Sequence, residues 1–123
     1  MNGLNGMKTI FCDIDGTIFK HHGTLQEIQL LQPEILDGVI EKFNEWKLKS
    51  YTIILVTGRP ESMREITNTH LETFGLYYDI LIMGLNNGPR VVINDNKPHD
   101  RNIEDMAVGI TIQRNEGIKN INV

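Results

Sequence analysis

The sequence predicts a single α/β domain with a largely parallel sheet of five strands. Short apolar runs rich in β-branched residues alternate with longer segments in which apolar residues recur at helical spacing. The chain has 123 residues, 40% of them hydrophobic, which is enough for one buried core. No internal repeat or low-complexity tract interrupts the alternation, so a sheet covered by helices is the simplest architecture.

Each expected strand is an apolar run bounded by polar or glycine-containing turns. The five runs are residues 10–12, 51–56, 78–83, 90–93 and 107–112. Amphipathic helices are expected over residues 33–50 and 60–74, because Pro33 and Pro60 suit a first helical turn and helical periodicity follows each. Residues 18–25, with apolar residues on either side of a polar tip, are expected to form a small hairpin or flap.

Composition narrows the class of partner. The net charge at pH 7 is −4, and no run of Lys or Arg is longer than a pair. Both features argue against a broad electrostatic footprint for nucleic acid or for an anionic membrane. They leave room for recognition of a single phosphorylated end.

Cysteine usage and the N-terminal residues favour a cytoplasmic protein. Cys12 is the only cysteine, which excludes an internal disulfide and a zinc framework, and it is expected to be a buried core residue. No apolar stretch approaches the length of a membrane span. Residues 1–7 are rich in Asn and Gly, so we expect a loose leader there and no signal peptide.

Two carboxylates follow the first apolar run. Asp13 and Asp15 lie two residues apart where the expected strand ends, and Gly16 lets the backbone turn away. Open α/β sheets bind ligands at this edge. Two neighbouring carboxylates repel one another unless a cation or proton lies between them, and Mg²⁺ bound by carboxylates and phosphate oxygens suits such a pair. A carboxylate can also attack phosphorus itself. Taken alone, the motif is equally well explained as a solvated turn.

Polar residues also follow two later strands. Residues 57–59 (Thr-Gly-Arg) end the second strand, where a Thr hydroxyl and the amides of a helix start can donate to phosphate oxygens. Asp95, Lys97 and Asp100 follow the fourth strand. Because the carboxyl ends of parallel strands share one edge, these clusters are expected to meet there. Together they would supply a nucleophile, an acid/base, a phosphate donor, a cation and a further metal carboxylate, as phosphoester hydrolysis requires.

These motifs resemble those of the haloacid dehalogenase (HAD) superfamily of phosphohydrolases, over nearly the whole chain. Residues 11–17 are similar to the first motif of that family, in which the first Asp is the nucleophile and the second is the general acid/base. Residues 54–59 are similar to the second motif, whose Thr or Ser binds the transferring phosphoryl group. Asn94-Asp95, with Asp100 five residues on, is similar to the fourth, metal-binding motif.

The resemblance implies a Rossmann-like three-layer domain and a role for each matching residue. It implies Mg²⁺ as the cofactor, with Asp13, Asp15 and Asp95 as ligands and Asp100 as an outer-shell residue. It implies phosphate-binding residues in the two turns, namely Gly16, Thr17, Gly58 and Arg59, and catalytic residues Asp13, Asp15, Thr57 and Lys97.

One part of the family's pattern is missing. Its third motif carries a Lys that precedes the acidic motif by about the length of one strand, whereas residues 84–90 contain no Lys. Lys97 and Arg90 are the two candidates for this cation. Lys97 is preferred because its loop already belongs to the expected site, while Arg90 begins the fourth expected strand and would have to reach the opposite edge of the sheet.

The resemblance also implies a reaction and a kind of substrate. An Asp at the position of Asp15 is typical of phosphatases and phosphomutases, so Asp13 would attack phosphorus while Asp15 protonates the leaving oxygen and then activates water. The chain leaves no room for a cap domain, and capless relatives act on larger phosphorylated molecules or close their site by forming homo-oligomers. Residues 84–95 and 112–118 resemble small HAD proteins linked to surface-polysaccharide biosynthesis, which favours a sugar phosphate or a nucleotide-sugar precursor as the small-molecule substrate.

Two other functions stay open. A polynucleotide end phosphatase fits the motifs, but the acidic balance opposes it. A catalytically silent module that binds phosphate or a partner protein fits the missing Lys, but the intact first and second motifs oppose it. His21 and His22, on the flap, are most simply solvated, although they could contact a substrate, and His70 is expected to be a structural residue of the second helix.

Overall fold

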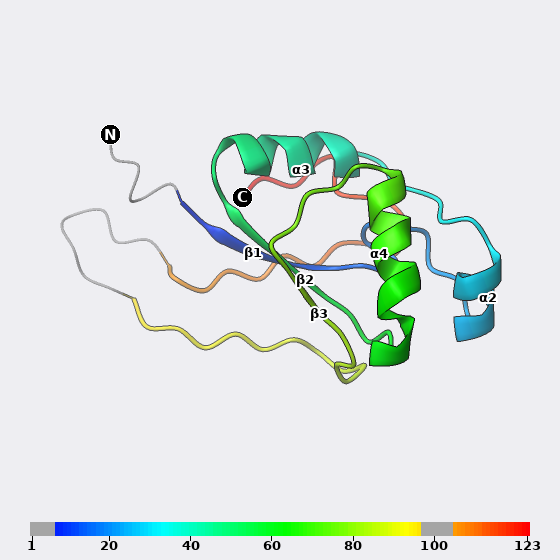
Figure 1. The fold of residues 1–123 in the computed structure, drawn as a ribbon. Helices are drawn as coiled ribbons and strands as arrows, with labels where there is room; N and C mark the ends of the chain where they lie inside the picture. Colours follow the sequence, from blue (N-terminus) through cyan, green and yellow to red (C-terminus); the bar gives the residue numbers. More distant parts are fainter. Residues whose placement is uncertain (1–6, 97–104) are drawn as a thin grey trace.

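A parallel three-stranded sheet in the order β1-β2-β3 forms the centre of the computed structural model (Figure 1), which describes residues 7–96 and 105–123. β1 is Thr9–Asp13, β2 is Thr52–Val56 and β3 is Ile80–Ile82. The α/β class and the parallel sheet are therefore confirmed. The leader over residues 1–6, Lys97 and Asp100 lie outside the described residues.

The register of the sheet aligns the carboxyl ends of its strands. Asp13 pairs with Val56, and Val56 pairs with Ile82. The residues that follow β1 and β2 therefore leave the sheet side by side, as the sequence predicts for a parallel sheet. Cys12 is buried, and burial raises the pKa of its thiol to about 12, which confirms its expected place in the core.

Two longer helices pack against the sheet, and both bury the stripe that their periodicity indicates. α3 is Val39–Leu48 and buries Val39, Phe43 and Trp46. The second expected helix forms as a 3₁₀ turn, Glu61–Met63, followed by α4, Arg64–Thr73. No helix among the described residues is long and apolar enough to cross a membrane.

The first expected helix begins later than its sequence indicates, at Val39 and not at Pro33. Residues 34–36 are instead extended, because their backbone bonds to the loop after β1. Lys20 N–H donates to Glu34 O (2.9 Å), and Leu36 N–H donates to Ile18 O (2.9 Å). These tertiary hydrogen bonds outweigh local helical periodicity, which carries no information about a distant partner.

The expected flap over residues 18–25 is only partly a surface feature. Ile18 and Phe19 are buried in the core, so the segment is anchored to the domain at that point. A short helix, α2 (Leu25–Leu30), follows and was not expected. Thr24 caps its start, since Thr24 Oγ1 accepts from Glu27 N–H (3.1 Å), and the Thr24 hydroxyl also donates to the Glu27 carboxylate (3.1 Å).

The five-strand expectation is wrong for the described residues, which form three strands. Residues 90–93 and 107–112 run as extended chain without ladder pairing (Figure 1, yellow and orange). Val91 and Ile93 are 79% and 94% exposed. Their β-branched side chains favour extended backbone, but a strand also needs a hydrogen-bonded neighbour, and composition alone does not supply one.

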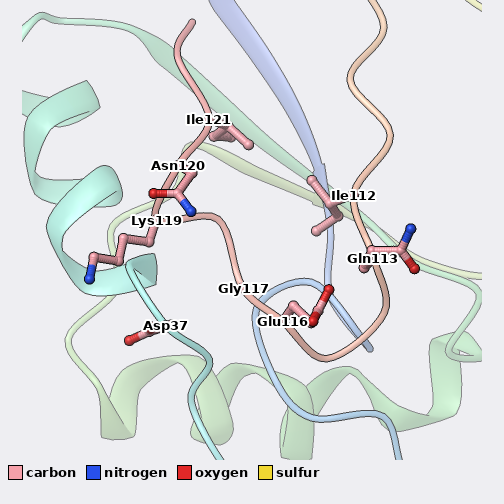
Figure 2. A pocket seen from close by; sticks show the side chains of 8 residues that line it. All are labelled: Asp37, Ile112, Gln113, Glu116, Gly117, Lys119, Asn120 and Ile121. Carbon is pink, nitrogen blue, oxygen red and sulfur yellow. The ribbon is translucent and has the colours of Figure 1, made fainter.

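The C-terminal segment packs back onto the start of α3. Ile118 is buried, and its N–H donates to Asp37 O (2.9 Å). Gly117 has a positive φ of 82° and lies against the Asp37 backbone, where a Cβ would collide. Figure 2 shows the hollow at this junction, about 380 Å³ in volume, which shares no lining residue with the larger cleft described below.

We predict that Gly117→Ala lowers the free energy of unfolding by about 3 kcal/mol, because it combines a strained backbone with a steric clash. The matched control is Gly75→Ala, since Gly75 also has a positive φ (64°) but has no neighbour within 4 Å of the added Cβ. The control should lose only about 1 kcal/mol in urea unfolding. Equal losses in the two variants would show that the C-terminal segment does not pack as described.

Candidate active site

A cleft of about 670 Å³ opens where β1 and β2 end. The sequence-predicted residues that line it are Asp13, Asp15, Thr57, Gly58 and Arg59. It is also lined by both flap histidines, His21 and His22, and by two further arginines, Arg90 and Arg114. The structure therefore brings the first and second motifs together, as parallel strand ends require.

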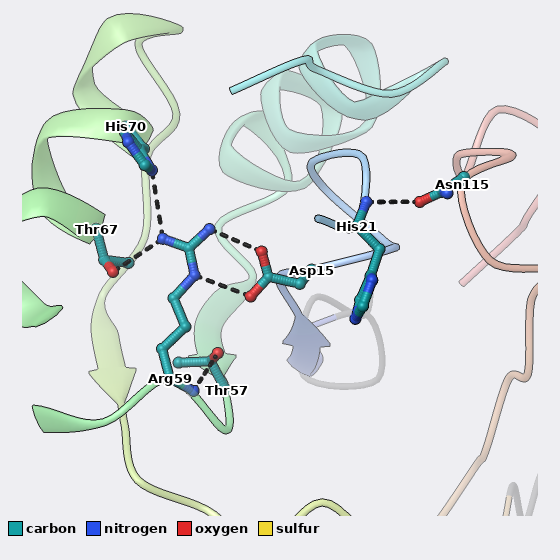
Figure 3. Close-up of polar contacts among 7 residues, drawn as sticks. All are labelled: Asp15, His21, Thr57, Arg59, Thr67, His70 and Asn115. Carbon is teal, nitrogen blue, oxygen red and sulfur yellow. Dashed lines mark hydrogen bonds and ion pairs between the residues drawn. The ribbon is translucent and has the colours of Figure 1, made fainter. Parts of the chain in front are cut away.

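The strongest polar contact in the cleft is a bidentate ion pair (Figure 3). Arg59 Nε donates to Asp15 Oδ2 (2.8 Å), and Arg59 Nη2 donates to Asp15 Oδ1 (2.7 Å). The side chains are 3% and 17% exposed. Two parallel charge-assisted bonds fix the orientation of the Asp15 carboxylate more tightly than a single bond would. Arg59 was expected to bind phosphate, but its guanidinium is used to hold Asp15.

The same guanidinium is anchored to α4. Arg59 Nη1 donates to Thr67 Oγ1 (3.0 Å) and lies 3.3 Å from His70 Nδ1. Burial lowers the pKa of His70, and the Arg59 charge lowers it further, so the imidazole is neutral at pH 7 and its Nδ1 can accept from Arg59. This confirms the structural role expected for His70.

Thr57 directly follows β2 and lines the cleft. Its Oγ1 accepts from the N–H of Arg59 (3.0 Å), so the hydroxyl hydrogen stays available as a donor. Its side chain is fixed by this bond and by near-complete burial, since Thr57 is 1% exposed. A pre-oriented hydroxyl at this position can donate to an oxygen of an anion in the cleft.

Asp13 ends β1 in a partly buried position. Burial raises its pKa above the ordinary value, and the negative charge of Asp15 raises it further. The N–H of Ile14 and the charges of Arg90 and His21 act in the opposite direction. Asp13 is thus a carboxylate whose negative charge is only partly compensated, which suits it to contact a cation or an electrophilic phosphorus.

Three other predicted residues lie elsewhere. The amides of Gly16 and Thr17 donate within their own turn, to Phe19 O (2.7 Å) and Ile14 O (3.1 Å), and neither residue lines the cleft. Asp95 is exposed and does not line the cleft either. It follows the extended run 90–93, which is not part of the sheet.

Arg90, in contrast, lines the cleft and acts on the charge of Asp13. The expectation that Arg90 begins a strand and would have to reach the opposite edge of the sheet is wrong, because residues 90–93 form no strand. Arg90 belongs to a loop whose carbonyls accept from its Nη1, namely Asn86 O (2.6 Å) and Gly88 O (3.0 Å). Lys97, the other candidate, lies outside the described residues.

The described residues do not assemble the metal site that the sequence predicts. No group of three His, Cys, Asp or Glu side chains among them could hold a metal ion. Asp13 offers a carboxylate in the cleft, but both Asp15 oxygens are bound by Arg59, and Asp95 is remote from the cleft lining. The donor set therefore fits Mg²⁺ only through Asp13.

The cleft has a lining residue that sequence reasoning missed, Arg114, which lies on the turn over residues 113–117. Asn115 N–H donates to Gly16 O (2.9 Å), and Asn115 Oδ1 accepts from His21 N–H (2.7 Å) (Figure 3). These contacts place Arg114 at the cleft. The only local signal is the Arg-Asn-Glu-Gly turn sequence, which shows that the chain bends there and gives no hint of what it packs against.

Comparison with solved structures supports the fold class. The "Pnkp1/Rnl/Hen1 complex" and "Pnkp1/Rnl/Hen1 RNA repair complex" structures contain chains 27% and 28% identical, with TM-scores of 0.56 and 0.57. Each likeness covers 70% of this chain and 30% or 28% of the other chain. A Vibrio cholerae protein, 20% identical over 70% of this chain and 80% of its own, shares the fold with a TM-score of 0.53.

The fold and the first two motifs agree with the resemblance to the haloacid dehalogenase superfamily of phosphatases, and the chain is similar in sequence to two curated phosphatases. No family model matches it. Two curated relatives are named D-glycero-beta-D-manno-heptose-1,7-bisphosphate 7-phosphatase. The protein from Photorhabdus laumondii subsp. laumondii is 41% identical over 61 residues, and that from Salmonella typhi is 37% identical over 71 residues. These matches cover 50% and 57% of this chain but only 31% and 37% of the relatives' length.

We predict that Asp13→Asn stabilises the metal-free protein at pH 7. Because the pKa of Asp13 is raised in the folded state, the folded protein binds this proton more tightly than the unfolded chain does. The wild type therefore loses stability as the pH rises through that pKa, whereas Asn carries no charge to desolvate. Urea unfolding with a chelator present should show an advantage for the variant at pH 7 that narrows toward pH 4. A wild type more stable than the variant at pH 7 would contradict the assigned environment.

Proposed function

We propose that the protein is a phosphomonoester hydrolase in which Asp13 is the nucleophile. The observation that carries the proposal is the arrangement at the two strand ends. A partly buried carboxylate lies beside a pre-oriented Thr57 hydroxyl and a second carboxylate held by Arg59. Nucleophile, donor and proton-transfer group are thus collected in one cleft, which is the set of roles that phosphoryl transfer needs.

The proposed reaction has two steps. In the first, an Asp13 oxygen attacks phosphorus and the bond from phosphorus to the leaving oxygen breaks. Asp15 gives a proton to that oxygen, which requires one Asp15 oxygen to leave the ion pair with Arg59 and take up a proton when the substrate binds. In the second, water attacks the aspartyl-phosphate, Asp15 takes a proton from the water, and inorganic phosphate leaves with Asp13 regenerated. The Thr57 hydroxyl and the Arg90 guanidinium would bind the phosphoryl oxygens, while Arg59 holds Asp15 in place.

We further propose that Mg²⁺ is required, with Asp13 as its ligand in the cleft. A hard divalent ion would compensate the Asp13 charge and supply electrostatic stabilisation to the phosphoryl group. We propose Asp95 as a second ligand, which requires its segment to approach the cleft when Mg²⁺ binds. Asp95→Asn should therefore weaken the activation by Mg²⁺.

For the substrate, we propose a phosphorylated small molecule of the sugar-phosphate class, bound in the cleft at the ends of β1 and β2. The support comes from the two heptose bisphosphate phosphatases, which are 41% and 37% identical to this chain over 61 and 71 residues. A polynucleotide end is the second candidate, because the chains of the RNA repair complex resemble this one over 70% of its length. The net charge of −4 favours the small molecule.

The test is hydrolysis of 4-nitrophenyl phosphate with and without Mg²⁺. We expect Mg²⁺-dependent turnover by the wild type and a loss of about a thousandfold or more in Asp13→Asn, because the variant has no nucleophile. Asp105→Asn is the matched control, since Asp105 is exposed and does not line the cleft. Full turnover by Asp13→Asn would disprove the assignment.

Two further outcomes separate the alternatives. Activity confined to a phosphorylated oligonucleotide, with a rate that falls steeply as salt is added, would favour the polynucleotide function. Absence of turnover on every substrate, together with failure to bind a phosphate mimic such as orthovanadate, would favour a non-catalytic module.

A further inference from the structure

Arg114 reaches the cleft on a turn that is fixed at several points. Asn115 is bonded through its backbone to Gly16 and through its side chain to His21. Two residues further on, Gly117 packs against Asp37, and Ile118 is 2% exposed. The position of Arg114 is therefore built into the fold, although almost a hundred residues separate it from the first motif.

The Arg114 side chain lies directly against the turn that follows β1. A Cβ placed on Gly16 would be 3.2 Å from Arg114 Cγ and 3.9 Å from Arg114 Nε, and the same Cβ would be 3.8 Å from His21 Cβ. Arg114 and His21 thus flank the Gly16 turn together, and both line the cleft. They form its rim on the side of the C-terminal segment.

The charges of the cleft leave Arg114 without an assigned partner. Two carboxylates, Asp13 and Asp15, face three guanidinium groups. Arg59 is paired with Asp15, and Arg90 is the arginine whose charge acts on Asp13. Arg114 is exposed and forms no ion pair within residues 7–96 and 105–123. The cleft thus carries an excess positive charge in a chain whose net charge is −4.

We propose that Arg114 binds a second anionic group, a phosphate or a carboxylate, on the leaving portion of the substrate. This rests on the proposed function and narrows the substrate class to phosphomonoesters that carry two anionic groups. A guanidinium recognises either group with paired hydrogen bonds. The cleft volume of about 670 Å³ is within the usual range for a site that holds a small metabolite.

Arg114 is on this account a specificity-determining residue, so its removal changes the choice between ligands. The test is calorimetric titration of the full-length Asp13→Asn protein, which binds without turnover. The ligands are fructose 6-phosphate, fructose 1,6-bisphosphate and 6-phosphogluconate. We expect at least one of the two doubly anionic ligands to bind about tenfold more tightly than fructose 6-phosphate, and the better of the two identifies the second group.

Adding Arg114→Gln to this background should remove the tenfold advantage, and Arg114→Lys should restore part of it because the charge remains while the planar fork is lost. Arg64→Gln is the matched control, since the Arg64 side chain is 40% exposed, pairs with Glu61 and lies outside the cleft lining. It should keep the full advantage.

The inference is overturned if no doubly anionic ligand is preferred, if no ligand binds, or if Arg114→Gln keeps the preference while its thermal unfolding matches that of the parent. Because the titration involves no catalysis, its failure is separate from failure of the proposed function. A wild type that hydrolyses 4-nitrophenyl phosphate but prefers no second anion would retain the phosphatase assignment and reject the role of Arg114.

Discussion

The ion pair between Arg59 and Asp15 is the interaction on which the cleft depends. Asp15 follows β1 and Arg59 follows β2, so the pair joins the loops that leave the two strand ends. The third guanidinium nitrogen extends the same contact to Thr67 and His70 on α4. Each nitrogen of this buried guanidinium has a partner, so the loops and the helix are fixed together. The buried charge of Arg59 thus holds together the loop after β1, the loop after β2 and α4.

Thr57 and Asp13 are positioned next to this ion pair. The Thr57 hydroxyl is oriented by the Arg59 amide, and Asp13 lies where the β1 strand ends beside Asp15. The raised pKa of Asp13 reflects a carboxylate kept in a position that disfavours its charge. Such a position is unfavourable for stability and suitable for chemistry, because the charge is best compensated by what binds there. The C-terminal turn bonds to the loop that carries Asp15 and so brings Arg114 to the cleft.

Local patterns predicted the parts of the fold that depend on local chemistry. β1, β2 and β3 follow from apolar β-branched runs, and the stripe of α4 follows from helical spacing. The start of α3 was missed because residues 34–36 bond to the loop after β1, and that partner leaves no trace in local periodicity. Residues 90–93 have the composition of a strand, yet strand formation depends on a hydrogen-bonded neighbour.

Arg59 was expected to bind phosphate, because its motif indicates only that it follows a strand at the carboxyl edge of the sheet. Its ion-pair partner, Asp15, depends on how two loops meet in the folded protein. Arg114 could not be found from sequence, since only the folded C-terminal turn brings it to the cleft.

The most direct test of this account is a double-mutant cycle on the free energy of unfolding, with Asp15→Asn, Arg59→Gln and the combined variant. Each single change leaves a buried polar group without its partner, so the single variants should be strongly destabilised, and the combined variant should lose less than the sum of their losses. We expect a coupling free energy of about 2 kcal/mol or more between the two side chains. Losses that add to within about 0.5 kcal/mol would contradict the central role of the pair.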